Sequence, residues 1–315
     1  MDIKAVLLLN MGGPNHLDDV PLFLYNMFCD KNILTISNPI LRSIVARCIV
    51  ALRVKESTRN YSLIGGKSPI VAHTKRLVEA LSKQDSKTHF DFAMSYTPPF
   101  IHDIIARFKT ANLDELTLFS LYPHYSTTTT LTSLELVQKA CNACAYYPKI
   151  HTIDRYYNDA YYNDAIVARI QESLAAHSMD SQEVVLLFSA HGLPEKVVQK
   201  GDPYVEEILQ NIAILGEKLE AEGIRFKKIM HAFQSHIGPV RWTKPFISEV
   251  LDELSGESVL VYPIAFSIDN SETDYELSIQ YRQYAKEKNI KAYEVCACLN
   301  DSPLFVRAIL NLIHS

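Results

Sequence analysis

The stretch EVVLLFSAHGLP, residues 183–194, decides the fold class of this chain. Its first half is a continuous apolar run, which is typical of a strand buried on both faces of a parallel sheet. Its second half places His191 among small residues, directly before Gly192. Open α/β sheets bind their ligands beyond the carboxyl ends of the strands. His191 is therefore a candidate functional residue, although a lone histidine after a strand is more often a structural one.

Such apolar runs alternate with helical patterns along the chain and form two groups of four, over residues 4–153 and 183–296. This alternation predicts an α/β fold of two Rossmann-like lobes, each with a parallel four-stranded sheet, and a cleft between them. We expect an N-terminal lobe over residues 1–145, a C-terminal lobe over 146–300, and a last helix over 301–315 that packs back on the N-terminal lobe. The predicted strands are 4–9, 88–94, 115–121, 148–153, 183–189, 227–233, 257–266 and 291–296. The predicted helices are 16–28, 40–54, 71–83, 101–110, 131–144, 160–176, 204–222, 244–254, 272–287 and 303–313.

The composition is that of an ordinary globular protein and argues against several function classes. Of the 315 residues, 48% are hydrophobic and 21% are charged, and the net charge of −5 makes nucleic acid an unexpected partner. The N-terminal apolar run is too short for a secretory signal, and no apolar stretch approaches the roughly 18 residues of a membrane span. We therefore expect a cytoplasmic protein, whose oligomeric state the sequence does not predict.

Nucleotide-binding and hydrolase motifs are incomplete. The sequence NMGGP at residues 10–14 is not the G-x-G-x-x-G of dinucleotide-binding folds. GGKS at residues 65–68 lacks the earlier glycine of a phosphate loop, because Tyr61 stands in its place. SAHG at residues 189–192 lacks the serine of a hydrolase elbow. Nicotinamide, nucleotide and serine-hydrolase chemistry therefore have little support.

A second candidate site follows the most apolar strand of the chain. Glu272 and Glu276 are four residues apart, so they share one face of a predicted helix near its start. The structural interpretation is helix capping, with Ser271 as N-cap and Asp274 in the first turn. The functional interpretation joins this acidic face to His191 in an imidazole–carboxylate site. Such a site suits proton removal or the passage of a divalent metal.

Seven segments of the sequence, taken in chain order, resemble the ferrochelatase family, and the resemblance runs from about residue 4 to residue 314. The compact chain resembles the bacterial type. The resemblance implies a lyase of haem and porphyrin biosynthesis that inserts Fe²⁺ into protoporphyrin IX to form haem. It implies iron and porphyrin as substrates and no required cofactor. The segments are LLLNMGGP, FLYNMFCD, IGGKSPI, LYPHYSTTTT, LLFSAHGLPEKVVQKGDPY, FQSHIGPVRW and PIAFSIDNSETDYE.

The resemblance also implies roles for particular residues. His191 and Glu272 match the family's catalytic pair, which handles the metal and the pyrrole protons and would bind the substrate iron. Asp269 and Glu276 match acids along a polar path for metal or protons. The positions that match porphyrin-binding segments are Asn10, Tyr25, Met27, Phe28, Tyr122, Tyr125, Ser126 and Trp242.

Three positions depart from the family pattern. Asn270 stands where many members carry histidine, which weakens any mechanism that needs two histidines at the site. Ser95 replaces a common arginine, and His236 replaces a common arginine or lysine. An arginine can pair with a porphyrin propionate, so propionate recognition is expected to differ here, with Arg241 and Lys244 as substitutes.

The cysteines allow two interpretations. Cys141 and Cys144 form a C-x-x-C pair, and Cys296 and Cys298 form a C-x-C pair. Two close pairs could hold a [2Fe–2S] cluster or zinc on four thiolates. The alternative is that they are small buried thiols.

Two further alternatives remain open. The segment 31–54 is amphipathic, and it either packs in the core or docks the cleft mouth peripherally on the inner face of a membrane. The substrate could be coproporphyrin or another tetrapyrrole instead of protoporphyrin. A two-lobed protein that binds haem or iron without catalysis is the alternative from a different class.

Overall fold

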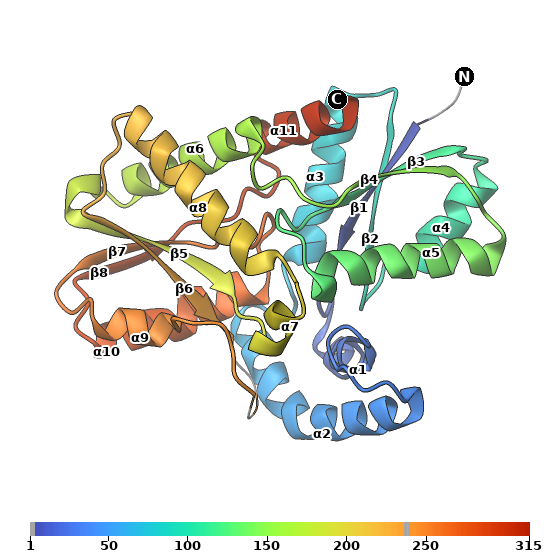
Figure 1. Cartoon of the computed structure of the whole chain (residues 1–315), viewed down its shortest axis with the longest axis horizontal. Coiled ribbons are helices and arrows are strands. Elements are labelled where there is room, and N and C mark those ends of the chain that lie inside the picture. Colours follow the sequence, from blue (N-terminus) through green and yellow to red (C-terminus); the bar gives the residue numbers. More distant parts are fainter. Residues whose placement is uncertain (1–3, 236–237, 239) are drawn as a thin grey trace. The chain divides into compact units, whose positions relative to one another are not determined.

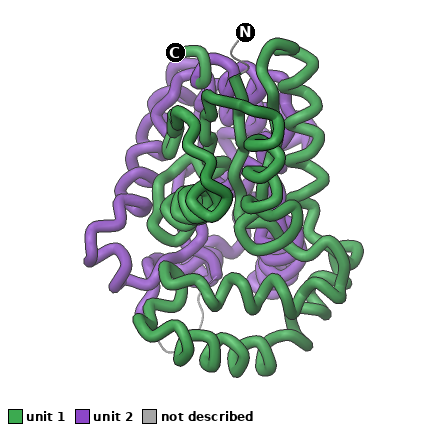
Figure 2. Tube along the Cα trace, turned by 90° about the vertical axis from the view of Figure 1, so that its right-hand side faces the viewer, with its two compact units in different colours: residues 1–155, 313–315 green, residues 156–312 purple. Residues whose placement is uncertain are grey.

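The computed structural model describes residues 4–235, 238 and 240–315. The chain divides into two compact units, shown in different colours in Figure 2. Unit 1 comprises residues 1–155 and 313–315, and unit 2 comprises residues 156–312. The domain boundaries expected at 145 and 300, and the docking of the last helix, stay predictions.

Unit 1 is built on a parallel sheet with the strand order β2–β1–β3–β4. Helices α4 and α5 cover one face of this sheet, where Phe108 and Val137 pack with Leu7 and Leu118 of the strands. The strands are β1 (Lys4–Asn10), β2 (His89–Met94), β3 (Glu115–Ser120) and β4 (Lys149–Ile153). The helical elements, several labelled in Figure 1, are η1 (Leu17–Asp19), α1 (Val20–Cys29), α2 (Pro39–Leu63), α3 (Ile70–Gln84), α4 (Ile101–Thr110), η2 (Thr127–Leu131) and α5 (Thr132–Cys144).

Helices α1 and α2 form a separate hydrophobic cluster within unit 1. Phe23 and Phe28 of α1 pack there with Tyr61 of α2. Met11, which follows β1, and Tyr96, which follows β2, belong to the same cluster. The α1–α2 pair therefore sits at the carboxyl edge of the unit 1 sheet, where the resemblance places the porphyrin-binding segments.

Unit 2 repeats the arrangement with the parallel strand order β6–β5–β7–β8. One face of its sheet carries a core in which Leu187 and Val261 pack with Ile247 of α9 and Leu277 of η4. The strands are β5 (Val184–His191), β6 (Lys228–Gln234), β7 (Ser258–Tyr262) and β8 (Ala292–Val295). The helical elements are α6 (Ala160–Ala176), η3 (Ser181–Glu183), α7 (Glu195–Gln199), α8 (Tyr204–Ala221), α9 (Ile247–Asp252), η4 (Glu272–Tyr281), α10 (Arg282–Glu287) and α11 (Pro303–His314), the last ending in unit 1.

The predicted α/β fold with two parallel four-stranded sheets is confirmed. The prediction differs from the structure mainly at element ends. The strand expected over 257–266 ends at Tyr262, because Pro263 cannot donate to the ladder. The helix expected over 40–54 continues to Leu63. The predicted helix 272–287 begins as the π-helix η4 and becomes α-helical only at Arg282.

Candidate active site in unit 2

His191 is the last residue of β5, the strand that pairs with both β6 and β7. Residues 184–190 of this strand are all buried, and His191 is its first partly exposed residue. The hydroxyl of Tyr204 donates a hydrogen bond to the His191 carbonyl oxygen at 3.0 Å. The imidazole therefore projects from a backbone that the β6 ladder and the Tyr204 hydroxyl hold in place.

The residues after His191 bring an indole ring close to the strand end. The Gly192 N–H donates to the Gln234 carbonyl at 2.7 Å. A Cβ at Gly192 would lie 3.0 Å from that oxygen and 3.4 Å from Cε3 of Trp242, so glycine allows this close approach. Leu193 and Thr243 then exchange hydrogen bonds of 2.9 and 3.0 Å, which hold the Trp242 segment beside the end of β5.

Glu272 opens η4, and Asn270 caps this helix. The Asn270 side-chain oxygen accepts from the N–H of Glu272 at 2.8 Å, and the Asn270 N–H donates to Thr273 Oγ1 at 3.0 Å. The predicted capping by Ser271 is wrong, because Ser271 already has helical φ and ψ angles and its hydroxyl donates instead to Glu272 Oε2 at 3.0 Å. The position where the resemblance leads one to expect histidine thus carries a neutral amide with a structural task.

His191 and Glu272 interact electrostatically. Burial lowers the pKa of His191, and the Glu272 carboxylate opposes this effect by favouring the imidazolium. Burial has the larger influence, so the net direction of the His191 pKa is downward. At neutral pH the imidazole is therefore unprotonated and can accept a proton, while a carboxylate stands ready to stabilise the imidazolium that results.

The other acids of this region are held by different partners. Asp269 is buried and accepts hydrogen bonds from the Cys298 N–H at 3.0 Å and from Asn300 Nδ2 at 2.6 Å. Glu276 accepts a hydrogen bond from Ser235 Oγ, directly after β6. The polar path proposed for these two acids stays a prediction.

Sequence reasoning placed Asp274 only in the first turn of a helix and missed that its surroundings shift the pKa of its carboxyl group. Burial and the neighbouring Asp269 raise the pKa of Asp274 to about 6. The available signal was an apolar strand followed by three acids within six residues, Asp269, Glu272 and Asp274. Their spacing alone does not say which of them has a pKa raised by burial.

In unit 1, Asn10 and Tyr122 organise the end of β1. Both are buried. The Met11 N–H donates to the Asn10 side-chain oxygen at 2.8 Å and to the Tyr122 hydroxyl at 3.2 Å. These two predicted porphyrin-binding residues, one at the end of β1 and one in the segment after β3, therefore meet at the Met11 N–H at the carboxyl edge of the sheet.

Tyr125 and Ser126 follow β3 in the neighbouring loop. The guanidinium of Arg155 lies 4.7 Å from the centre of the Tyr125 ring. Ser126 is buried, and its hydroxyl accepts from the Thr128 N–H at 3.2 Å as the N-cap of η2. Their assignment to porphyrin binding is untested and stays a prediction.

Of the three α1 residues that the resemblance assigns to the porphyrin, one is buried and two are partly exposed. Phe28 is buried in the α1–α2 cluster, whereas Tyr25 and Met27 are only partly buried against it. The Tyr25 hydroxyl lies 3.0 Å from Ser43 Oγ, and the guanidinium of Arg47 lies 5.8 Å from the Tyr25 ring centre. These contacts tie α1 to α2.

The cysteines give no support to the predicted cluster or zinc site. Cys141 is buried in the core under α5, and Cys296 and Cys298 are buried in unit 2. Burial raises the pKa of all three thiols, that of Cys296 to about 12, so the metal-binding thiolate is disfavoured. Over the described residues, no three His, Cys, Asp or Glu side chains are placed to hold a metal ion together.

The departures from the family pattern have local explanations in part. The Ser95 hydroxyl lies 3.1 Å from Ser133 Oγ. Lys244 Nζ donates to Glu249 Oε1 at 2.7 Å, so this lysine already has an anionic partner. His236 lies outside the described residues.

The comparison with known proteins identifies the family of this chain. The sequence model of the ferrochelatase family matches residues 3–315. The chain belongs to the ferrochelatase family. A ferrochelatase of Wolinella succinogenes is 48% identical over 98% of this chain and 98% of its own length, and one of Helicobacter pylori is 41% identical over 99% and 93%. The predicted lyase of haem biosynthesis, with iron and porphyrin as substrates, is confirmed.

Solved structures support the chelatase fold of this ferrochelatase-family chain. The sirohydrochlorin chelatase SirB from Bacillus subtilis subspecies spizizenii, in complex with cobalt, covers 99% of this chain and 94% of its own, with a TM-score of 0.58 and 11% identity. CbiX, described as the terminal enzyme for biosynthesis of siroheme in denitrifying bacteria, covers 99% and 98%, with a TM-score of 0.54 and 14% identity. At these identities the likeness concerns the fold alone.

The lowered pKa of His191 predicts a measurable response to its neighbour. Replacement Glu272→Gln removes the group that favours the imidazolium, so the pKa of His191 falls further. Because the folded-state pKa lies below the unfolded one, the stabilising contribution of neutral His191 is present above the ordinary histidine pKa and is lost as the pH falls below it. NMR titration of the imidazole signals in both proteins measures the shift. An unchanged or raised pKa in the variant would contradict the predicted interaction.

Proposed function

We propose that the chain inserts Fe²⁺ into protoporphyrin IX to form haem, with His191 as the proton acceptor and Glu272 as its carboxylate partner. The observation that carries the proposal is a neutral imidazole at the carboxyl end of β5, in electrostatic contact with the first residue of η4. Family membership supplies the reaction class, iron insertion into a porphyrin.

The chemistry requires a base and a route for protons. Metal insertion replaces two pyrrole N–H protons of the porphyrin by Fe²⁺, and both protons leave as H⁺. Neutral His191 accepts one pyrrole proton, and Glu272 stabilises the imidazolium. The same two side chains offer a nitrogen and an oxygen ligand to the incoming iron. Asp269 and Glu276 are proposed to carry metal or protons along a polar path.

The porphyrin itself needs an apolar wall and a rigid acceptor. Trp242, held close to Gly192, offers a flat aromatic surface beside His191. A bent porphyrin exposes a nitrogen lone pair to iron, and binding energy offsets the strain of bending. A histidine on a fixed strand end keeps its nitrogen apposed to the ring centre, which suits this task.

Coproporphyrin or another tetrapyrrole is the alternative substrate. These molecules share the pyrrole nitrogens and carboxylate substituents, so the His191–Glu272 pair serves all of them equally. The non-catalytic carrier loses its support because the chain belongs to a family of enzymes.

The first prediction concerns catalysis. Under anaerobic conditions the wild type metallates protoporphyrin IX, followed by the shift of the Soret band. His191→Ala and Glu272→Gln lower kcat/KM by about 100-fold or more, because a positioned acid–base group contributes that much, while porphyrin binding persists. His177→Ala, an exposed histidine of the same unit, serves as the control and retains activity. A wild type that binds but never metallates either protoporphyrin or coproporphyrin contradicts the proposal.

Arg53 is a better candidate for a propionate partner than the lysine predicted from the sequence. Its Nη1 atom is shielded from solvent and has no hydrogen-bond partner in the described part of the chain. Its neighbours Val50 and Val54 pack in the α1–α2 cluster. A buried donor without an acceptor is costly, and a guanidinium pairs well with a carboxylate. We therefore propose that Arg53 binds a propionate of the porphyrin.

Esterified porphyrin tests the role of Arg53. Arg53→Leu is expected to raise the Kd for protoporphyrin IX about tenfold, since a charge-assisted hydrogen bond is lost. The same variant binds the dimethyl ester of protoporphyrin as the wild type does, because the ester has no carboxylate. Arg59→Leu, an exposed arginine on the same helix, is the matched control. Equal losses for the acid and the ester would show that Arg53 does not recognise a propionate.

Helix α2 also presents an exposed apolar side, which bears on membrane contact. Ile40 is 72% exposed and Leu52 is 83% exposed, and Leu41 and Ile44 lie on the same side of the helix. No helix in the described residues is long and apolar enough to span a bilayer. We propose that this side of α2 contacts an anionic lipid surface at the inner face of the cytoplasmic membrane, because the helix is strongly basic. Apart from Arg53, which we assign to a propionate, its cations are Arg42, Arg47, Lys55 and Arg59, against Glu56 alone.

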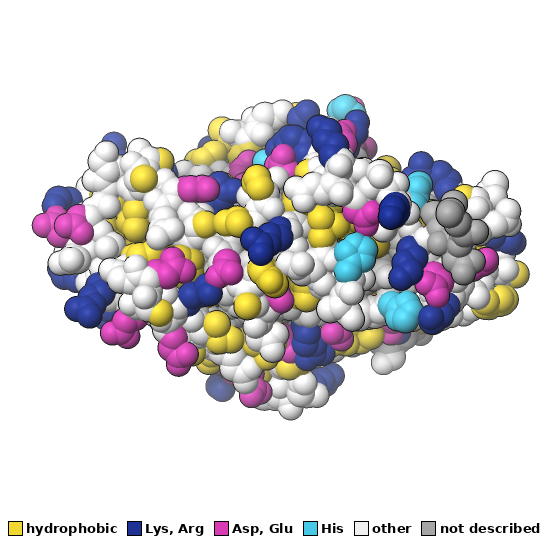
Figure 3. Space-filling view, turned by 90° about the horizontal axis from the view of Figure 1, so that it is seen from above, with side chains coloured by type: hydrophobic (Ala, Val, Ile, Leu, Met, Phe, Trp, Pro, Cys, Tyr) yellow, Lys and Arg dark blue, Asp and Glu magenta, His cyan; other side chains and the backbone are white. Residues whose placement is uncertain are grey.

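Vesicle flotation tests this contact. The wild type is expected to float with vesicles that contain anionic phospholipid and to float less with purely zwitterionic ones, because basic side chains add about 1 kcal/mol each near an anionic surface. Leu52→Glu abolishes flotation, whereas Leu209→Glu on α8, another exposed leucine, does not. Figure 3 shows a face where charges of both signs are interspersed, without such a basic apolar stripe. Flotation that is equal for both vesicle types and both variants would contradict the proposal.

A further inference from the structure

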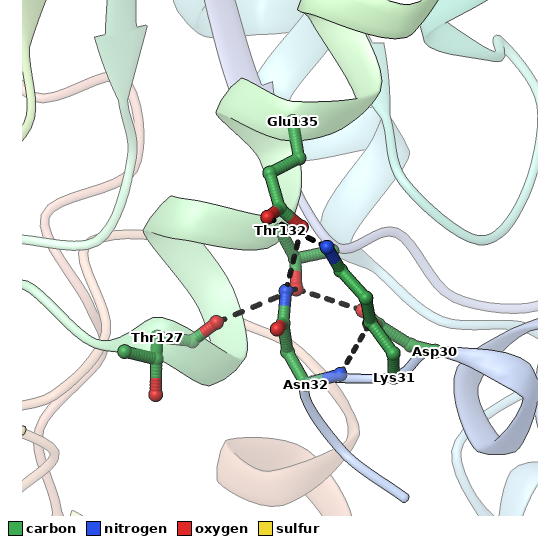
Figure 4. A network of polar contacts seen from close by, with 6 residues as sticks. All are labelled: Asp30, Lys31, Asn32, Thr127, Thr132 and Glu135. Atoms are coloured by element: carbon green, nitrogen blue, oxygen red, sulfur yellow. Dashed lines mark hydrogen bonds and ion pairs between the residues drawn. The ribbon is translucent and has the colours of Figure 1, made fainter. Parts of the chain in front are cut away.

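Asp30 follows the end of α1 and joins segments of unit 1 that are far apart in the sequence. Its Oδ2 atom accepts hydrogen bonds from the Tyr96 hydroxyl and from Thr132 Oγ1, both at 2.7 Å. Its Oδ1 atom accepts one from the Asn32 N–H at 2.8 Å. Figure 4 shows Thr132 and Asn32 converging on this carboxylate. Asp30 thus links the end of α1, the segment after β2 and the start of α5.

The hydroxyl groups of Tyr96 and Thr132 act as hydrogen-bond donors to Asp30. Tyr96 is 4% exposed, and burial together with the Asp30 carboxylate raises the pKa of its hydroxyl well above the usual range. Tyr96 therefore stays protonated. Thr132 Oγ1 accepts from Asn32 Nδ2 at 3.0 Å and donates to Asp30 at 2.7 Å, a much shorter contact than the 3.5 Å to the Thr127 carbonyl oxygen. A negatively charged acceptor makes these hydrogen bonds stronger than neutral ones.

Of the linked segments, α1 bears residues that the resemblance assigns to the porphyrin, and the other two adjoin such residues. Helix α1 carries three of them on the two turns before Asp30. Ser126 caps η2, which leads directly into α5. The Tyr96 N–H donates to the Met11 carbonyl at 3.0 Å, next to Asn10. The Asp30 carboxylate therefore connects α1 with the segments next to Asn10 and Ser126.

We propose that Asp30 is a positioning residue for the porphyrin, which it serves by holding α1 in place against the strand-end loops that carry Asn10 and Ser126. This inference rests on the proposed function, because it needs a porphyrin to be bound. The neighbouring ion pair Lys31–Glu135, at 2.8 Å, is exposed to solvent and contributes little to this positioning.

The test uses variants that keep the shape of the network. Asp30→Asn preserves volume but offers one acceptor atom fewer to the two hydroxyls. We expect the Kd for protoporphyrin IX, from fluorescence quenching, and KM to rise about tenfold, equivalent to about 1.4 kcal/mol, with kcat nearly unchanged. Thr132→Val acts in the same direction, and Thr132→Ser, which retains the hydroxyl, restores the wild-type Kd. Lys31→Ala is the matched control from the same segment and leaves Kd unchanged.

The outcomes separate this inference from the proposed function. A folded Asp30→Asn protein with a lower Tm but wild-type Kd and KM shows that the network is only structural, which overturns the inference while iron insertion stands. If Asp30→Asn does not fold, Tyr96→Phe and Thr132→Val decide, because the phenylalanine keeps the edge contact with Phe23. A wild type that neither binds nor metallates porphyrin overturns the proposed function, and the inference falls with it.

Discussion

The pairing of β5 with unequal neighbours is the constraint on which the candidate site depends. Its ladder with β6 continues to His191 opposite Gln234, whereas its ladder with β7 stops at Phe188 opposite Tyr262. The strand end therefore has a ladder partner on one side only, and on its other side the Ser189 carbonyl accepts from the Ile264 N–H at 3.0 Å, in the chain that leaves β7. That chain then turns into η4, and Leu277 of η4 packs in the same core as Leu187 of β5. Glu272 comes within electrostatic reach of His191 because one strand ends earlier than its neighbour.

Much of the fold could be predicted from the sequence, because the deciding signal is local. Strands such as Val184–His191 are buried on both faces, so they appear as uninterrupted apolar runs with polar ends. Position at the carboxyl edge then follows from parallel topology, which is how His191 was selected. The helix ends were less predictable. Ser271 and Asn270 are both good N-caps, and only the backbone angles show that Ser271 already lies inside the helix.

Contacts between distant segments could not be predicted. Tyr96 and Thr132 are 66 and 102 residues from Asp30, and no spacing rule connects them. The cysteines show the opposite case, in which a short spacing suggests a metal site that the described part of the structure does not support. Cys141 and Cys144 are three apart because one face of α5 is apolar, and Cys141 fills the core between that helix and the sheet. Spacing identifies neighbours along one element, but burial decides whether a thiol can become a ligand.

The amide at Asn270 has consequences for the proposed mechanism. An amide neither accepts nor releases a proton near neutral pH, so His191 is left to accept pyrrole protons without help from a second imidazole at that position. In the proposed mechanism the carboxylates then carry out the remaining proton transfer. Asp274, whose pKa is raised to about 6 by burial and by Asp269, is suited to take part in this proton transfer near neutral pH. By capping η4, Asn270 also holds the backbone N–H of Glu272. The site therefore lacks a second imidazole at position 270, but the amide there positions the carboxylate that supports His191.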